Sequence, residues 1–158
     1  MSTRDDELMR LAIQQAEHAR AIDEVPIGCV IEHAPTGRIV GVGHNQRERL
    51  QDPLAHAELL AIRQAAETLG SWRLLDCTLV VTLEPCPMCA GAIVNARIPR
   101  LVFGCADPKA GAVETLYRIC TDERLNHRVE VAAGVLSETC ATLLRDFFRG
   151  KRHRDATG

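Results

Sequence analysis

Two short motifs constrain the fold of this chain more than any other feature. His56-Ala57-Glu58 and Pro85-Cys86-Pro87-Met88-Cys89 together supply one imidazole and two cysteines three residues apart. Zinc takes such ligands in proteins, and a site with only three protein ligands keeps its fourth tetrahedral position open for water. Zinc lowers the pKa of that water to about 7, and a nearby carboxylate such as Glu58 can accept its proton. The motifs therefore predict a catalytic zinc site and a fold that brings the two segments together.

Each motif alone also has a simpler interpretation. A single Cys-x-x-Cys can be a redox pair, half of a structural zinc site or two buried thiols, and a His-x-Glu triplet occurs by chance in many helices. The sequence contains no second Cys-x-x-Cys and no His-x-x-x-His, so a structural site has no obvious fourth ligand. The two motifs in this order favour the catalytic site over these alternatives, which stay open.

The first motif is predicted to lie at the start of a helix. Asp52-Pro53 is a typical helix entry, the following residues 55–69 continue helically, and Gly70 is a typical end. His56 is therefore expected in the first turn. His56 and Glu58 are two residues apart, a spacing at which side chains diverge on a regular helix. Both reach one site only if their long side chains lean over the helix end.

The remaining hydrophobic pattern alternates between helical and extended periods. The expected elements are a helix over 5–22, strands over 27–32 and 38–44, a buried strand over 77–83, a helix beginning near Pro87, strands over 100–103 and 128–131, and a helix over 137–149. The first two strands are separated by a turn sequence and are expected to form an antiparallel hairpin. This order predicts an α/β fold with a mixed sheet of about five strands covered by helices. It also places the starts of two helices at the metal.

The composition is that of an ordinary globular protein. The chain has 158 residues, of which 46% are hydrophobic and 25% charged, and we expect one domain over residues 1–158. Its apolar stretches are too short for a membrane span, and residues 1–10 do not resemble a signal peptide. Seven scattered cysteines do not resemble a disulfide framework. We therefore expect a cytoplasmic protein without a membrane partner, in which Cys29, Cys77, Cys105, Cys120 and Cys140 are buried.

The C-terminal end is locally basic although the formal net charge of the chain is −2. Between Arg145 and Arg154 there are five Lys or Arg residues and one acid, Asp146. We expect a basic tail over about residues 149–158. Such a tail can bind phosphate, or it can be a solvated helix end, because cations favour helix C-termini.

The chain resembles the cytidine deaminase superfamily, and within it the bacterial tRNA-specific adenosine deaminases. The resemblance runs nearly from end to end. The segments that carry it are Glu24-Val25-Pro26-Ile27-Gly28, His44-Asn45, residues 53–58, Gly70-Ser71-Trp72-Arg73-Leu74, residues 81–92, Asp107-Pro108-Lys109, Asn126-His127-Arg128 and Phe147-Phe148-Arg149. The zinc motifs alone indicate the superfamily, whereas the last three segments resemble the tRNA enzymes.

The resemblance implies a three-layer α/β/α cytidine-deaminase-like fold and a homodimer with one Zn²⁺ per subunit. It implies deamination of adenosine to inosine at wobble position 34 in the anticodon stem-loop of tRNA. His56, Cys86 and Cys89 would be the zinc ligands, and Glu58 would be the catalytic proton shuttle. The substrate contacts would be Asn45, Ile27, Asp107, Lys109, Phe148 and Arg149, and one of Phe147 and Phe148 is expected to be buried.

Two other functions share part of this pattern. A deaminase of free bases, such as guanine or cytosine, would have both zinc motifs, with a C-terminal segment that closes the pocket instead of contacting RNA. A non-catalytic zinc module that binds RNA would have no use for Glu58. The chain also departs from the family at Leu54, commonly threonine, so we expect the helix cap from Asp52. Glu114 adds a negative charge near the expected RNA path.

Overall fold

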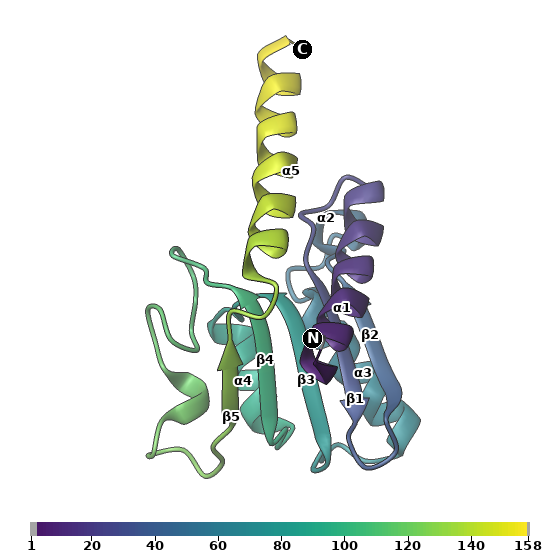
Figure 1. Ribbon diagram of the computed structural model, residues 1–158, viewed down its shortest axis with the longest axis vertical. Coiled ribbons are helices and arrows are strands. Elements are labelled where there is room, and N and C mark those ends of the chain that lie inside the picture. The colour runs from purple at the N-terminus through teal and green to yellow at the C-terminus, as the bar shows by residue number, and fades with distance from the viewer. Residues whose placement is uncertain (1–2, 158) are drawn as a thin grey trace.

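A five-stranded mixed sheet lies at the centre of the molecule (Figure 1). The computed structural model describes residues 3–157. In sheet order the strands are β2 (Arg38–His44), β1 (Gly28–His33), β3 (Cys77–Leu83), β4 (Arg100–Cys105) and β5 (Glu130–Ala133). β1 is antiparallel to β2 and β3, whereas β4 is parallel to β3 and β5. The predicted hairpin and the predicted mixed sheet are both confirmed.

Helices cover both faces of the sheet and give three layers. The helices α1 (Arg4–Ala21) and α5 (Ser137–Thr157) lie on one face, and α3 (Ala57–Leu69) and α4 (Pro87–Asn95) lie on the other (Figure 1). In β3, Leu79 and Val81 belong to the core under α3 and α4, and Val80 belongs to the core under α1 and α5. A strand buried on both faces is largely apolar, as β3 is apart from Thr78 and Thr82. The predicted α/β/α fold is confirmed.

Some boundaries differ from their predicted positions. β5 begins at Glu130 and not at residue 128, because the backbone N–H of Val129 donates to the carbonyl oxygen of Cys120 at 2.9 Å instead of joining the sheet. A short helix, α2 (Arg47–Leu50), precedes the first motif where a loop was expected. Four residues are too few to show a hydrophobic period. A single 3₁₀ turn, Ile119–Thr121, lies between β4 and β5.

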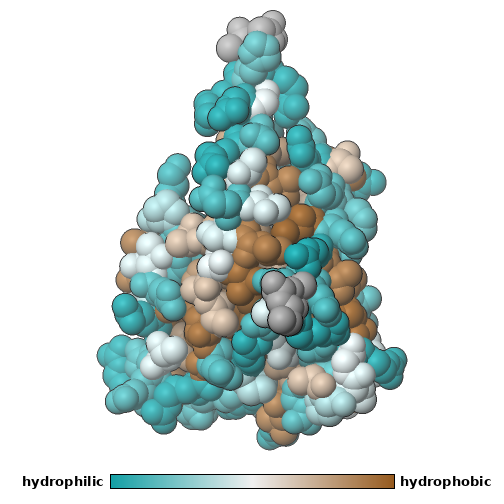
Figure 2. All heavy atoms as spheres, in the orientation of Figure 1, coloured by the Kyte–Doolittle hydropathy of each residue, from teal (hydrophilic) through white to brown (hydrophobic). Residues whose placement is uncertain are grey.

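The helix α5 continues beyond Arg149, its predicted end, to Thr157. Its outer turns extend past the sheet in Figure 1, and Figure 2 shows hydrophilic side chains there and hydrophobic ones where α5 meets the sheet. Arg154 Nη2 donates to Asp23 Oδ1 at 2.9 Å, which ties this end of α5 to the turn after α1. The expected tail is therefore helical as far as Thr157, and Gly158 lies outside the described residues.

Two further predictions concern burial and membrane insertion. All five cysteines outside the Cys-x-x-Cys pair are buried, as predicted. Among the helices described within residues 3–157, none combines the length and the apolar composition that crossing a membrane requires.

Gly43 in β2 lies directly against α3. A Cβ atom at this position would be 2.2 Å from the carbonyl oxygen of Ala57 and 2.9 Å from the backbone nitrogen of Ala61. We therefore expect Gly43→Ala to lower the free energy of unfolding by about 3 kcal/mol, because α3 must move away from the sheet. Urea denaturation measures this change. Gly91→Ala is the matched control, since nothing lies within 4 Å of a Cβ atom there and alanine favours a helix. A Gly43→Ala protein as stable as the wild type would contradict the packing.

Candidate active site

Both motifs lie at helix starts that face one point. Cys86 is the N-cap residue of α4, Pro87 is at its first position, and Cys89 lies in its first turn. His56 is the N-cap residue of α3, with an extended backbone at φ −77° and ψ 151°. The prediction that two helix N-termini converge is therefore confirmed. The prediction that His56 lies in the first turn is wrong by one residue.

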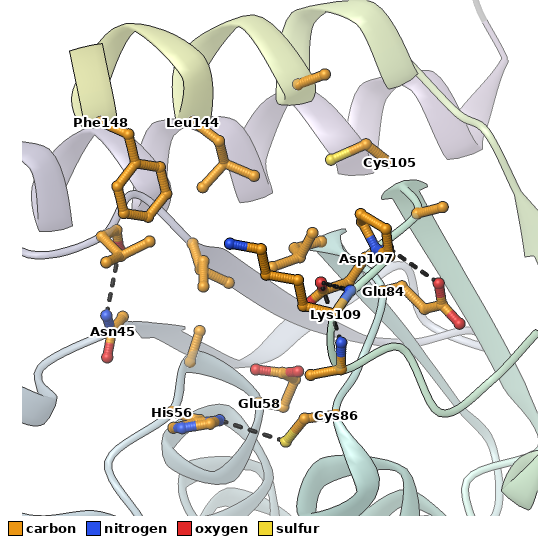
Figure 3. A pocket seen from close by; sticks show the side chains of 18 of the residues that line it. Asn45, His56, Glu58, Glu84, Cys86, Cys105, Asp107, Lys109, Leu144 and Phe148 are labelled. Atoms are coloured by element: carbon orange, nitrogen blue, oxygen red, sulfur yellow. Dashed lines mark hydrogen bonds between the residues drawn. The ribbon is translucent and has the colours of Figure 1, made fainter. Parts of the chain in front are cut away.

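That one-residue difference explains how both members of the first motif reach the site. Glu58 lies inside the first turn of α3, whereas His56 precedes the helix in an extended conformation. The divergence of residues two apart applies only when both are helical. The backbone at His56 therefore brings the imidazole to the same side as the Glu58 carboxylate, as Figure 3 shows.

The three metal-binding side chains have the spacing that zinc requires. Nδ1 of His56 lies 3.6 Å from Sγ of Cys86 and 3.5 Å from Sγ of Cys89. In a tetrahedral site with Zn–S bonds of about 2.3 Å and Zn–N bonds of about 2.0 Å, nitrogen and sulfur ligands are about 3.5 Å apart. Within residues 3–157, no other His, Cys, Asp or Glu joins this group. The residues fit a zinc ion held by three protein ligands.

The two thiols are prepared differently for metal binding. A hydrogen bond with Cys89 lowers the pKa of Cys86 to about 4, with help from His56 and against the effect of burial. The same hydrogen bond and burial raise the pKa of Cys89. The thiolate is the form that binds metals, and a helix N-terminus favours it. Metal binding must therefore release the proton that Cys89 retains.

Glu58 is a buried carboxyl group beside these ligands, with 4% of its surface exposed. Burial raises its pKa to about 7. A group with this pKa exists in both protonation states at neutral pH, so it can both accept and donate a proton. Glu58 thus has the burial and the acidity that a proton shuttle needs.

A cavity of about 530 Å³ opens beside Glu58. Its walls come from the residues before β1, the residues after β2, the end of β3, the N-termini of α3 and α4, the segment after β4, and α5 (Figure 3). Cavities of this size hold small ligands. Five of the six predicted substrate contacts line it: Ile27, Asn45, Asp107, Lys109 and Phe148.

The sixth predicted contact, Arg149, does not line the cavity. Its side chain is 74% exposed and pairs with Asp146 across one turn of α5, at 3.9 Å. Consecutive residues point in different directions on a helix, so Phe148 faces the cavity while Arg149 faces solvent. Phe147 is buried and Phe148 is 42% exposed, which confirms that one of the two is in the core.

Asn45 lies at the cavity wall with its amide already bonded to the protein. Its Oδ1 accepts a hydrogen bond from the backbone N–H of Arg47 at 3.1 Å, and its Nδ2 donates to the carbonyl oxygen of Val25 at 3.3 Å. An asparagine amide has two donor hydrogens and two acceptor lone pairs. One of each is therefore left for a substrate, in an orientation that the protein fixes.

The expected cap of α3 is wrong. Oδ1 of Asp52 accepts a hydrogen bond from the backbone N–H of Leu54 at 2.9 Å, which closes the turn before the helix. The N-cap residue, His56, makes no side-chain capping bond. Leu54 is 52% exposed. The side chain of Asp52 therefore holds the turn before α3 and does not cap the helix itself.

Glu84 is a residue of this cavity that sequence reasoning missed. It lies between β3 and Cys86 and is only 2% exposed. Burial favours its neutral form, but hydrogen bonds from the Thr115 hydroxyl and from the N–H groups of Glu114 and Asp107 keep its pKa below the ordinary value. The sequence signal that could have identified Glu84 is a charged residue directly after an apolar strand. Arg47 in α2 also lines the cavity and was missed.

The fold and the site together define a zinc-binding deaminase. Residues 2–105 match the family described as the cytidine and deoxycytidylate deaminase zinc-binding region, which contains all three metal-binding side chains and Glu58. Zinc is thus the cofactor, and His56, Cys86 and Cys89 form its potential site.

Comparison with individual proteins narrows this class. The chain is 50% identical over 146 residues to a tRNA-specific adenosine deaminase of Streptococcus pyogenes serotype M1, covering 92% of this chain and 84% of that protein. It is 48% identical over 152 residues to a tRNA-specific adenosine deaminase of Bacillus subtilis (strain 168), covering 96% and 93%. The chain belongs to the family of tRNA-specific adenosine deaminases.

A solved structure supports the same assignment. It comes from studies of A-to-I editing by tRNA:A34 deaminases at the wobble position of transfer RNA. It matches this protein with a TM-score of 0.82 and 43% sequence identity, and covers 87% of this chain and 99% of that one.

Proposed function

We propose that this protein converts adenosine at wobble position 34 of a tRNA anticodon to inosine, with release of ammonia. The observation that carries the proposal is the buried Glu58 beside the His56, Cys86 and Cys89 cluster, at a cavity of about 530 Å³. The names of the similar proteins support the choice of substrate. The three ligands would hold one zinc ion per subunit, which supplies an activated water when bound.

In this proposal Glu58 performs the proton transfers. Its carboxylate takes up the proton that the nucleophilic water loses and delivers it to ring N1 of the adenine. It then takes the proton of the hydroxyl group that has been added at C6 and gives it to the amine, which leaves as ammonia while C6 becomes a carbonyl, so water and adenosine give inosine and ammonia in balance. A pKa of about 7 suits both steps, because neither protonation state of Glu58 is strongly favoured at neutral pH.

The cavity walls would hold the target nucleoside once it leaves the base stack. Asn45 offers one donor and one acceptor, and Ile27 and Phe148 offer apolar surface to the ring. Bases of an anticodon loop are already unpaired, so extruding one costs a few kcal/mol at most. A base of a loop can therefore reach the cavity at a lower cost than a base of a duplex.

The surface around the cavity would bind the RNA backbone. Asp107 and Lys109 lie on the segment after β4, at the cavity wall. Arg149 faces solvent on the next residue after Phe148, and the basic outer turns of α5 continue from there. Lys109, Arg149 and the basic outer turns of α5 would neutralise phosphates that flank the flipped nucleotide. Residue Arg149 is thus assigned to the RNA backbone and not to the target base.

The domain organisation, the oligomeric state and the location of the protein are also proposed. We propose that residues 1–158 form one deaminase domain that acts as a cytoplasmic homodimer. Seven free cysteines suit a reducing compartment. Leu50 and Leu54, each 52% exposed at and after α2, offer apolar surface for a second subunit.

The test is to incubate the zinc-loaded protein with an anticodon stem-loop containing adenosine 34, and separately with free adenine, guanine and cytosine. We expect inosine in the stem-loop and no ammonia from the free bases, because a free base lacks the phosphates that Lys109 and Arg149 are proposed to bind. Nucleoside mass spectrometry and an ammonia assay measure the two products. Ammonia from a free base together with an unchanged stem-loop would contradict the proposal, and the protein would then be a free-base deaminase.

A further inference from the structure

The segment after β4 is folded around the carboxylate of Glu84. Residues 107–110 of this segment form one wall of the cavity, and Glu84, which also lines the cavity, lies next to them (Figure 3). No Lys, Arg or His within residues 3–157 forms a salt bridge with Glu84, so its charge is satisfied in another way. Hydrogen-bond donors of the segment after β4 take the place of a cation.

Both carboxylate oxygens accept several hydrogen bonds. Oε2 accepts from the backbone N–H groups of Val113 at 3.1 Å, Glu114 at 2.8 Å and Thr115 at 3.0 Å. Oε1 accepts from the backbone N–H of Asp107 at 3.1 Å and from the hydroxyl of Thr115. Three successive N–H groups that point at one oxygen form a nest, which is a backbone arrangement that binds anions. The nest here is occupied by a side chain of the same protein.

The segment approaches Glu84 so closely that only glycine fits at one position. A Cβ atom on Gly111 would be 2.4 Å from Oε1 of Glu84 and 2.7 Å from the carbonyl oxygen of Asp107. The next residue is also fixed, because the backbone N–H of Ala112 donates to the carbonyl oxygen of Pro85 at 2.9 Å. Both anchors, Glu84 and Pro85, directly precede Cys86.

The tip of the segment is shaped by a second carboxylate. Oδ1 of Asp107 accepts from the backbone N–H groups of Lys109 at 3.0 Å and Ala110 at 3.2 Å. Since Asp107 is itself held by Glu84 through its backbone, the hydrogen bonds run from Glu84 to the tip without interruption. The position of the tip therefore depends on Glu84.

We propose that Glu84 is a positioning residue, whose carboxylate holds the cavity wall of residues 107–110 in place relative to the zinc ligands and Glu58. For substrate binding this inference rests on the proposed function, because Asp107 and Lys109 are assigned there to the RNA backbone. The part that concerns the wall itself rests only on the contacts within the protein.

The substitution that separates positioning from packing is Glu84→Gln. Glutamine has nearly the same shape, but it places an NH₂ donor where one carboxylate oxygen accepts, so it faces N–H groups with no acceptor. We expect the amide hydrogens of Val113, Glu114 and Thr115 to exchange with solvent at least about tenfold faster. Hydrogen exchange followed by mass spectrometry on the zinc-loaded protein measures this, and zinc content is measured alongside.

Glu24→Gln is the matched control. Glu24 is also 2% exposed, and its carboxylate accepts from the backbone N–H groups of Glu48 and Arg49 at 3.2 and 2.7 Å. This variant should speed exchange around α2 and leave residues 113–115 unchanged. Unchanged exchange at residues 113–115 in Glu84→Gln, or equally faster exchange throughout that protein, would overturn the proposal. If Glu84→Gln fails to fold, Thr115→Val is the alternative variant, because it removes only the hydroxyl donor to Glu84.

Kinetics test the consequence for the substrate. With the anticodon stem-loop, Glu84→Gln should raise KM at least about tenfold, lower kcat less than threefold and keep the zinc content of the wild type. A loss of kcat alone, with KM unchanged, would overturn the assignment to substrate positioning. If the wild-type protein does not act on the stem-loop, the proposed function fails, while the exchange data still decide whether Glu84 holds the wall.

Discussion

Replacing Glu58 by alanine is expected to lower kcat for an adenosine-34 stem-loop by about 10⁴-fold, the upper range for loss of a general acid and base. The expectation is large because Glu58 is assigned two proton transfers. Asp107, the other carboxyl group among the predicted catalytic and substrate residues, is not buried. Single-turnover assays with nucleoside analysis measure the rate without a contribution from product release.

The control for this experiment must exclude damage to the fold and to the metal site. Glu58→Gln keeps the shape of the side chain and should lose as much activity, while both variants keep the zinc content of the wild type. In the metal-free protein a carboxyl pKa raised from 4.5 to about 7 destabilises the folded state as pH rises from about 4.5 to about 7, and the full loss is present above that range. Glu58→Gln should therefore unfold at a higher temperature than the wild type at pH 8. Turnover within tenfold of the wild type in either variant would rule out the proton transfers assigned to Glu58.

Removing one sulfur ligand should abolish zinc binding and activity together. Cys86→Ala leaves one imidazole and one thiol, so we expect zinc content below about a tenth of the wild type, since catalytic zinc sites use three protein ligands. The change also removes the thiolate with the lowest pKa in the cluster. Elemental analysis after dialysis against a weak chelator measures the bound zinc, and the stem-loop assay measures the activity.

Cys140→Ala is the matched control for the ligand experiment. Cys140 is as buried as Cys89, but it packs in the core between the sheet and α5, away from the cluster. This variant should lose some stability, as core truncations do, and should keep its full zinc content. Equal zinc loss from Cys86→Ala and Cys140→Ala would mean that zinc retention reports folding and not ligation.

The residues of the potential zinc site could be predicted from the sequence because their chemistry depends on residue type and short spacing. Cys86 and Cys89 are three apart, and Pro87 favours a helix start between them, so local signals suffice. The extended backbone of His56 could not be predicted, because nothing local distinguishes an N-cap histidine from one in the first turn. Its position is decided by contacts with a segment 30 residues away in the chain.

Glu84 was missed for a different physical reason. Apart from the hydroxyl of Thr115, its partners are N–H groups of the backbone, which every residue type except proline carries, so no pattern of side chains marks them. They lie between 23 and 31 residues further along the chain. The buried strand β3, by contrast, was predicted correctly because a strand covered on both faces is mostly apolar, and that run is visible in the sequence. Long-range backbone contacts are thus the part of the site that needed the structure.

The placement of Phe148 on α5 bears on how the protein matures during synthesis. The metal ligands are complete in sequence once Cys89 has been made, whereas the apolar wall of the cavity includes Leu144 and Phe148. Chains emerge from the ribosome starting at the N-terminus. A nascent chain can therefore acquire its zinc ligands well before the substrate cavity has its wall, and a ribosome-bound intermediate could carry metal without yet accepting RNA.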